Sequence, residues 1–227
     1  MNQVYGSPLR PDTALQPRDT GARSNTSIRL RGNVLRLRDD QARALRMGME
    51  DRPILAIQAA FGTGKTVVAA LIAARLSSTE RILVATATTN VAVAQLTDTL
   101  LGLDEFRSRL SVLRFVADTA IREGAPTTPV DLHPILLGLA ANPTDTLTER
   151  EIARLRRYAR GRSLIERVLR DPNAAFGMTE EEREEYRIAE YDNSDATEEA
   201  VAIMLKVRFP TILCMTVSAL LNSTRPG

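Results

Sequence analysis

A short glycine-containing segment, residues 59–66, has the residue types and the spacing needed to bind phosphate. It reads Ala-Ala-Phe-Gly-Thr-Gly-Lys-Thr and fits the P-loop pattern, with alanine in place of the first glycine. Such a loop wraps an anion with backbone N–H groups, and the positive end of the following helix adds to the attraction. The sequence therefore predicts a nucleotide-binding loop formed by Ala59, Gly62, Thr63, Gly64, Lys65 and Thr66.

Within this loop Lys65 and Thr66 are the predicted catalytic residues, and ATP and Mg²⁺ are the predicted cofactors. Lys65 would reach the β- and γ-phosphates, and the Thr66 hydroxyl would coordinate Mg²⁺. Lys65 and Lys206 are the only lysines among 30 basic residues, so the choice of lysine here is notable. A compact ammonium suits this position better than a planar guanidinium. The alternative is a glycine-rich turn without a ligand.

The segments around the loop predict an α/β fold with a mainly parallel sheet. Short apolar runs suit buried parallel strands, and apolar residues at helical spacing suit helices that cover a sheet. Alternation of the two is typical of α/β proteins. We predict strands at 54–57, 82–85, 112–117 and 211–215, and helices at 39–49, 66–76 and 90–101.

Residues 131–208 interrupt this alternation and predict an inserted helical stalk. The segment 147–170 is rich in arginine, whereas 178–205 is rich in acidic residues. Capping boxes begin both segments, at Thr148 with Glu151 and at Thr179 with Glu182. We predict an antiparallel helical hairpin with its tip at 171–177. The alternative is two independently solvated helices, and pairing with the acidic helix is a better use of the arginines than contact with nucleic acid.

Composition excludes several classes of protein. The 227 residues are 44% hydrophobic, which excludes global disorder. One cysteine, Cys214, and one histidine, His133, exclude a disulfide framework within the chain and argue against a zinc cluster. We expect Cys214 to be a core residue and His133 to pack at the stalk base. No apolar run is long enough for a membrane span, and single-cysteine usage fits an intracellular compartment, nucleus or cytoplasm.

The sequence around the loop resembles the first RecA-like domain of superfamily 1 helicases, in the branch of the nonsense-mediated-decay RNA helicase. The resemblance rests on Gln41 upstream of the loop, on Ile57-Gln58 before it, and on the run Ile82–Val93 after it. It implies that Gln41 reads the adenine edge, and that Thr88, Thr89, Asn90 and Thr216 contact single-stranded nucleic acid. The alternatives are a helix-start polar residue for Gln41, helix N-capping for the 88–90 segment, and a strand-end turn for Thr216.

The same resemblance implies an organisation in which the stalk divides one RecA-like domain. We expect a disordered arm at 1–30, the first part of the RecA-like ATP-binding domain at 31–130, the stalk at 131–208 and the rest of the domain at 209–227. The predicted partners are single-stranded RNA or DNA, with protein partners possible at the stalk and no membrane.

The function implied is the ATP-binding part of an ATP-dependent RNA or DNA helicase motor. These helicases also use an Asp-Glu pair after a further strand, arginine fingers and a second RecA-like domain, none of which we identify, so we expect slow turnover from this chain alone. One alternative is a non-catalytic module that binds nucleotide or a partner. Another is an unrelated P-loop ATPase or kinase with Asp118 at the metal site. Arg114, within a predicted strand, is either an ion-pair partner or a functional group.

Overall fold

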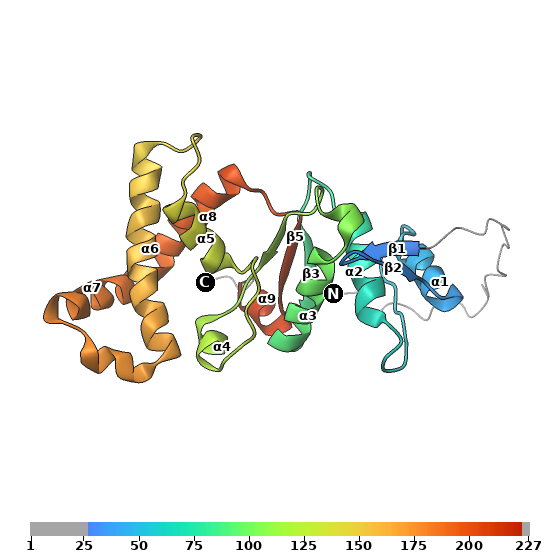
Figure 1. Ribbon diagram of the computed structural model, residues 1–227, viewed down its shortest axis with the longest axis horizontal. Helices are drawn as coiled ribbons and strands as arrows, with labels where there is room; N and C mark the ends of the chain where they lie inside the picture. The colour runs from blue at the N-terminus through green and yellow to red at the C-terminus, as the bar shows by residue number, and fades with distance from the viewer. Residues whose placement is uncertain (1–26, 224–227) are drawn as a thin grey trace.

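Three parallel strands lie at the centre of the molecule (Figure 1). The computed structural model describes residues 27–223. The strands are β3 (Leu83–Ala87), β4 (Val112–Arg114) and β5 (Ile212–Thr216), and β5 lies between the other two. Both pairings are parallel, as the α/β prediction requires. The predicted strands at 82–85, 112–117 and 211–215 are thus confirmed, although the second is shorter than expected.

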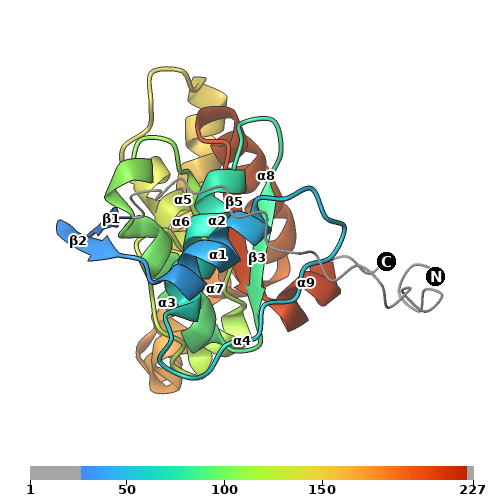
Figure 2. The same ribbon diagram turned by 90° about the vertical axis from the view of Figure 1, so that its right-hand side faces the viewer.

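Helices pack against this sheet or against one another, and three of them confirm the predicted helices. These are α1 (Asp39–Gly48), α2 (Lys65–Leu76) and α3 (Asn90–Leu101). The short helix α9 (Val217–Ser223) lies on the opposite side of β3 from α2 and α3 (Figure 2). The main apolar core includes Leu71, Val93 and Ile212. This mixed α/β arrangement is that of a RecA-like P-loop domain.

The segment 54–57 is not a strand, so that prediction is wrong. Its side chains are exposed except for the half-buried Leu55, with Ile54 at 78% and Ile57 at 43%. Apolar composition favours a strand, but a strand also needs a neighbour that accepts its backbone hydrogen bonds. None of the strand pairings among residues 27–223 includes this segment. It instead forms part of the connection between α1 and the P-loop.

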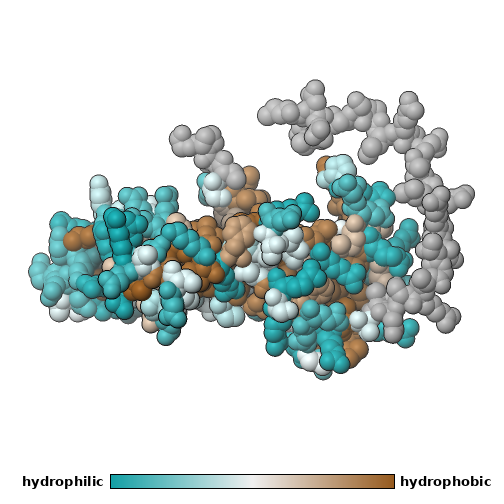
Figure 3. All heavy atoms as spheres, turned by 90° about the horizontal axis from the view of Figure 1, so that it is seen from above, coloured by the Kyte–Doolittle hydropathy of each residue, from teal (hydrophilic) through white to brown (hydrophobic). Residues whose placement is uncertain are grey.

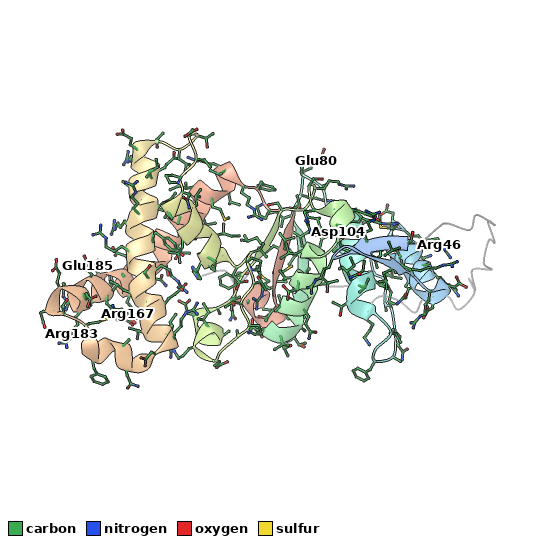
Figure 4. The ribbon with its side chains drawn as sticks, in the orientation of Figure 1. Arg46, Glu80, Asp104, Arg167, Arg183 and Glu185 are labelled. Atoms are coloured by element: carbon green, nitrogen blue, oxygen red, sulfur yellow. The ribbon has the colours of Figure 1, made fainter. Side chains whose placement is uncertain are left out.

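A β-hairpin begins at residues 27–30, which we expected to be the end of the disordered arm. Strands β1 (Ser27–Leu30) and β2 (Asn33–Arg36) pair in antiparallel fashion through the turn Arg31-Gly32, where both φ angles are positive, at 51° and 78°. Two positive φ angles are those of a hairpin turn that matches the strand twist. The Asp104 carboxylate, in the turn of helix η1 (Asp104–Phe106), accepts a hydrogen bond from the Gly32 N–H at 2.7 Å (Figure 4). The rest of the predicted arm, residues 1–26, lies outside the described residues.

The insertion is a helical stalk with the predicted antiparallel pairing. Helix α6 (Glu149–Arg170) is followed by a 3-10 turn, η2 (Pro172–Gly177), and by the acidic helices α7 (Glu180–Tyr191) and α8 (Asn193–Val207), which both pack against α6. Ion pairs across the stalk run in opposite order along the two arms: Arg154 with Glu199, Arg157 with Asp192, Arg160 with Glu185, and Arg167 with Glu182. Figure 4 labels Arg167 on α6 and Glu185 on α7. The acidic arm differs from expectation only in its break at Asp192.

The local signals that predicted the stalk also match its geometry. Both capping boxes form, because each threonine accepts from the N–H of the glutamate three residues on and each glutamate accepts from the threonine N–H. The Lys206 ammonium and the capping bonds of Thr148 lower the pKa of Glu151 to about 2. Polar and charged residues cover the stalk, which is mostly teal in Figure 3. Exposed pairs of this kind contribute only a few tenths of a kcal/mol each, and therefore fix register more than stability.

The stalk base joins the sheet through an apolar cluster and a buried polar network. The cluster joins Leu136 of helix α5 (Leu132–Ala141), Leu155 of α6 and Met204 of α8 to Leu113 of β4. Beside it, His133 Nδ1 lies 2.6 Å from the Tyr158 hydroxyl, so His133 packs at the stalk base as expected. No helix in the described part of the chain is long and apolar enough to cross a membrane.

Candidate functional site

The P-loop has the backbone geometry that its glycines predict. Gly62 and Gly64 have φ values of 73° and 81°, a region that favours glycine. A Cβ atom on Gly64 would lie 2.6 Å from the amide nitrogen of Gln41, so a larger residue here would displace the Gln41 side chain. Helix α2 begins directly after, at Lys65, and its N-terminal N–H groups therefore lie at the loop. The arrangement is that of an anion site at a helix N-terminus.

The Lys65 ammonium lies inside this loop. It donates hydrogen bonds to the carbonyl oxygens of Ala59 at 3.1 Å and Ala60 at 2.7 Å, and it lies 5.0 Å from the centre of the Phe61 ring. The Thr63 hydroxyl also donates to the Ala60 carbonyl, at 2.7 Å. Binding of a phosphate at Lys65 would therefore replace carbonyl oxygens by phosphate oxygens around the same ammonium.

A cavity of about 260 Å³ adjoins the loop, between α1 and α2. Its walls combine apolar side chains with two glutamine amides, and its lining includes Lys65. The predicted residues that it brings together are Gln41, Ala59, Thr63 and Lys65. Apolar walls with a few polar groups are typical of sites for planar ligands. A nucleotide with its base in this cavity and its phosphates at the loop fits the residues present. The other lining residues are Asp40, Ala44, Ile57, Gln58, Val68, Ala69 and Ile72.

Gln41 connects the start of α1 to the P-loop. Its amide nitrogen donates to the Thr63 carbonyl at 2.8 Å, and its amide oxygen accepts from the Arg38 N–H at 2.9 Å. The helix-start role considered as the alternative is therefore present. Each amide group retains capacity for a second hydrogen bond. Recognition of adenine by Gln41 stays a prediction, supported by its place in the cavity wall.

Thr66 is exposed in the first turn of α2, one residue after Lys65. A hydroxyl oxygen is a hard ligand of the kind Mg²⁺ prefers, and Mg²⁺ in nucleotide sites is held by few protein ligands and by phosphates. The position next to the lysine fits this role, and coordination of Mg²⁺ by Thr66 stays a prediction.

The predicted nucleic-acid residues lie together at the carboxyl ends of adjacent strands. Ala87, the last residue of β3, pairs with Thr216, the last residue of β5, so residues 88–90 and Thr216 are neighbours in space although far apart in sequence. Thr89 caps α3 by accepting from the Ala92 N–H at 3.2 Å, and Thr216 accepts from the Ala219 N–H at 3.2 Å. The two alternatives, helix N-capping for the 88–90 segment and a strand-end turn for Thr216, are thus present. Thr88 and Thr89 are exposed, which leaves them free to contact a ligand.

Other residues considered from sequence have structural partners. Arg114 is fully buried and pairs with Asp131 at 3.0 Å, as one of its two readings expected. The Asp118 carboxylate is bound by the Arg162 guanidinium at 2.7 Å and 3.1 Å, which argues against a role as a metal ligand. Cys214 is a buried core residue, and burial raises the pKa of its thiol. Sequence reasoning missed Arg162, because its pairing with Asp118 has no local signal.

Comparison with known proteins identifies the domain. Residues 36–200 match a family model described as an AAA domain. This range includes the P-loop, Gln41, residues 88–90 and most of the stalk. No curated protein matches the chain. The matched AAA domain is one that occurs in superfamily 1 helicases, and the match covers more than half of the chain. The chain therefore belongs to this AAA domain family and is a helicase-like P-loop domain of the nucleotide-binding type.

Proposed function

We propose that this chain is the ATP-binding part of an ATP-dependent helicase motor that acts on single-stranded RNA or DNA. The observation that carries the proposal is the P-loop with Lys65, which adjoins a cavity walled by apolar side chains and by Gln41. A second observation supports it: the threonines predicted to contact nucleic acid lie together at the carboxyl edge of the sheet. Ligands of open α/β sheets bind at this edge.

At the nucleotide site each residue has a separate task. Backbone N–H groups of residues 62–66 and the Lys65 ammonium would hold the phosphates, Thr66 would hold Mg²⁺, and the cavity would receive the base. Mg²⁺, when bound, neutralises charge on the phosphates. Gln41 would transmit the presence of a base to the loop, because the same side chain already bonds the Thr63 carbonyl.

At the nucleic-acid site Thr88, Thr89, Asn90 and Thr216 would contact the phosphate backbone of one strand. Hydroxyl and amide groups suit phosphate oxygens without reading base sequence. Contacts to phosphate make binding dependent on salt, so affinity should fall as salt is raised. RNA and DNA oligonucleotides of the same sequence should be compared directly.

Nucleotide binding is tested with a fluorescent ATP analogue. We expect Lys65→Ala to lose at least tenfold in affinity, because a charged hydrogen-bond donor to phosphate is removed. Lys206→Ala is the matched control, since it removes the other lysine of the chain, at an exposed position on the stalk helix α8. Equal affinity for Lys65→Ala and the control would refute the nucleotide site.

Nucleic-acid binding is tested by fluorescence anisotropy with a labelled single strand. We expect Thr88→Ala to weaken binding several-fold and to leave nucleotide affinity unchanged, because Thr88 is exposed at the sheet edge and does not cap α3. Thr99→Ala, at a half-buried position in the last turns of α3, is the control. Wild-type protein that binds no single strand at low salt would refute this part and favour a nucleotide-binding module without a nucleic-acid partner.

A further inference from the structure

Arg114 is a fully buried arginine at the end of β4, and its guanidinium connects segments that are distant in sequence. One terminal nitrogen donates to both carboxylate oxygens of Asp131, at 3.0 Å and 3.3 Å, and to the Pro126 carbonyl at 2.8 Å. Asp131 is the residue before α5, where the stalk insertion begins. This side of the guanidinium is therefore fixed to the stalk base.

The other terminal nitrogen of the Arg114 guanidinium points toward α3. It donates to the backbone carbonyl of Asn90 at 3.3 Å. Asn90 is the first residue of α3 and follows Thr89 directly. A single side chain thus bonds both the stalk base and the backbone of the segment 88–90.

The carboxylate of this pair is itself fixed in place. Asp131 accepts from the Thr128 N–H at 3.0 Å and from the Thr128 hydroxyl at 2.5 Å. In contrast, the Arg114 Nε atom is buried without a hydrogen-bond partner. Burying a charged group without satisfying all its donors costs stability, so maximal stability is not what this arginine provides. A residue that lowers stability in this way is expected where its role is to hold two segments in a fixed relative position.

We propose that Arg114 is a positioning residue for the single-strand contact: it holds the backbone of residues 88–90 at a fixed place relative to the stalk base. The inference rests on the proposed function of residues 88–90 and names a residue that acts on them without touching the ligand. Arginine is required because its planar fork presents several donors in fixed directions, which lysine cannot do. A change in the position of Asp131 would reach Asn90 through this one group.

Two substitutions of similar side-chain size test the connection that Arg114 makes between Asp131 and Asn90. Arg114→Lys keeps the charge and the ion pair with Asp131, but one ammonium cannot also reach the Asn90 carbonyl. Asp131→Asn keeps the shape and removes the charge that orients the guanidinium. Arg122→Lys, at an exposed position on helix α4 (Asp118–Arg122), is the matched control for an arginine-to-lysine change.

The readouts separate positioning from general stability. In Arg114→Lys we expect single-strand affinity to fall about tenfold, the effect of one charged hydrogen bond. Nucleotide affinity should stay within twofold of wild type, because the P-loop makes no contact with Arg114. Hydrogen–deuterium exchange of peptides covering residues 88–94 should become at least tenfold faster, while peptides from α2 stay unchanged. Asp131→Asn should also lower single-strand affinity and speed exchange over residues 88–94. Arg122→Lys should change neither.

The outcomes distinguish this inference from the proposed function. If wild type binds single strands and both variants bind them equally well, Arg114 does not position the contact and the inference is overturned, while the function stands. If wild type binds no single strand, the proposed function fails, and the exchange rates alone decide whether Arg114 holds residues 88–94. If Arg114→Lys does not fold, Asp131→Asn provides both measurements, and unchanged exchange in that variant overturns the inference.

Discussion

Replacing Arg162 by methionine should destabilise the protein by about 3 kcal/mol. The Arg162 side chain is fully buried at the stalk base, where it donates two hydrogen bonds to Asp118 and one, at 3.1 Å, to Glu166. Methionine fills a similar volume but leaves the Asp118 carboxylate without its cation, whereas Glu166 retains Arg170, at 3.6 Å. Removing one partner of a buried ion pair costs roughly 3–5 kcal/mol, and the lower end applies because the Asp118 side chain is 33% exposed and partly screened.

The assay is urea unfolding of the full chain, followed by circular dichroism, for wild type and variants. Asp118→Asn should cost less, about 1–2 kcal/mol, because the amide oxygen still accepts a bond and Arg162 retains Glu166. Arg183→Ala is the control, since Arg183 pairs with Glu180, whose side chain is 93% exposed, and should change stability by no more than about 0.5 kcal/mol.

A loss below about 1 kcal/mol in Arg162→Met would refute the reasoning, because it would mean that the Asp118 carboxylate tolerates the loss of its cation. A loss equal to that of Arg183→Ala would lead to the same conclusion. Agreement with about 3 kcal/mol would identify the Arg162–Asp118 pair as a main link between the stalk and the sheet domain.

Three further outcomes are expected. Gly161→Ala should lower stability in urea unfolding, since its Cβ would lie 2.8 Å from that of Ala189, whereas Gly138→Ala, with no atom within 4 Å, should raise it by about 0.5–1 kcal/mol. Burial, and then the charge of Arg162, lower the pKa of His133 from 6.5 to about 4. The unfolded state therefore protonates first, stability falls as pH drops from 6.5 to 4, and His133→Asn should lose less across that window. Gly64→Ala should abolish binding of the ATP analogue with the stalk still folded by circular dichroism, because φ at this position is 81°.

The sequence determined the parts of the protein that depend on neighbouring residues. The glycines and the lysine of residues 59–66 predict the loop, because positive φ angles and a helix start are local properties. The two capping boxes predict where α6 and α7 begin, for the same reason. The opposite charges of the two arms predict their pairing, since they leave one favourable way for the helices to meet.

Tertiary structure decided everything that depends on which distant segments meet. It placed β5, the last strand, between β3 and β4, and so brought Thr216 beside residues 88–90. It left the apolar segment 54–57 without a strand partner, and it assigned Arg162 to Asp118 and Arg114 to Asp131. The pairing of strands and the burial of charges depend on contacts between residues far apart in sequence. A short stretch of sequence therefore cannot predict them.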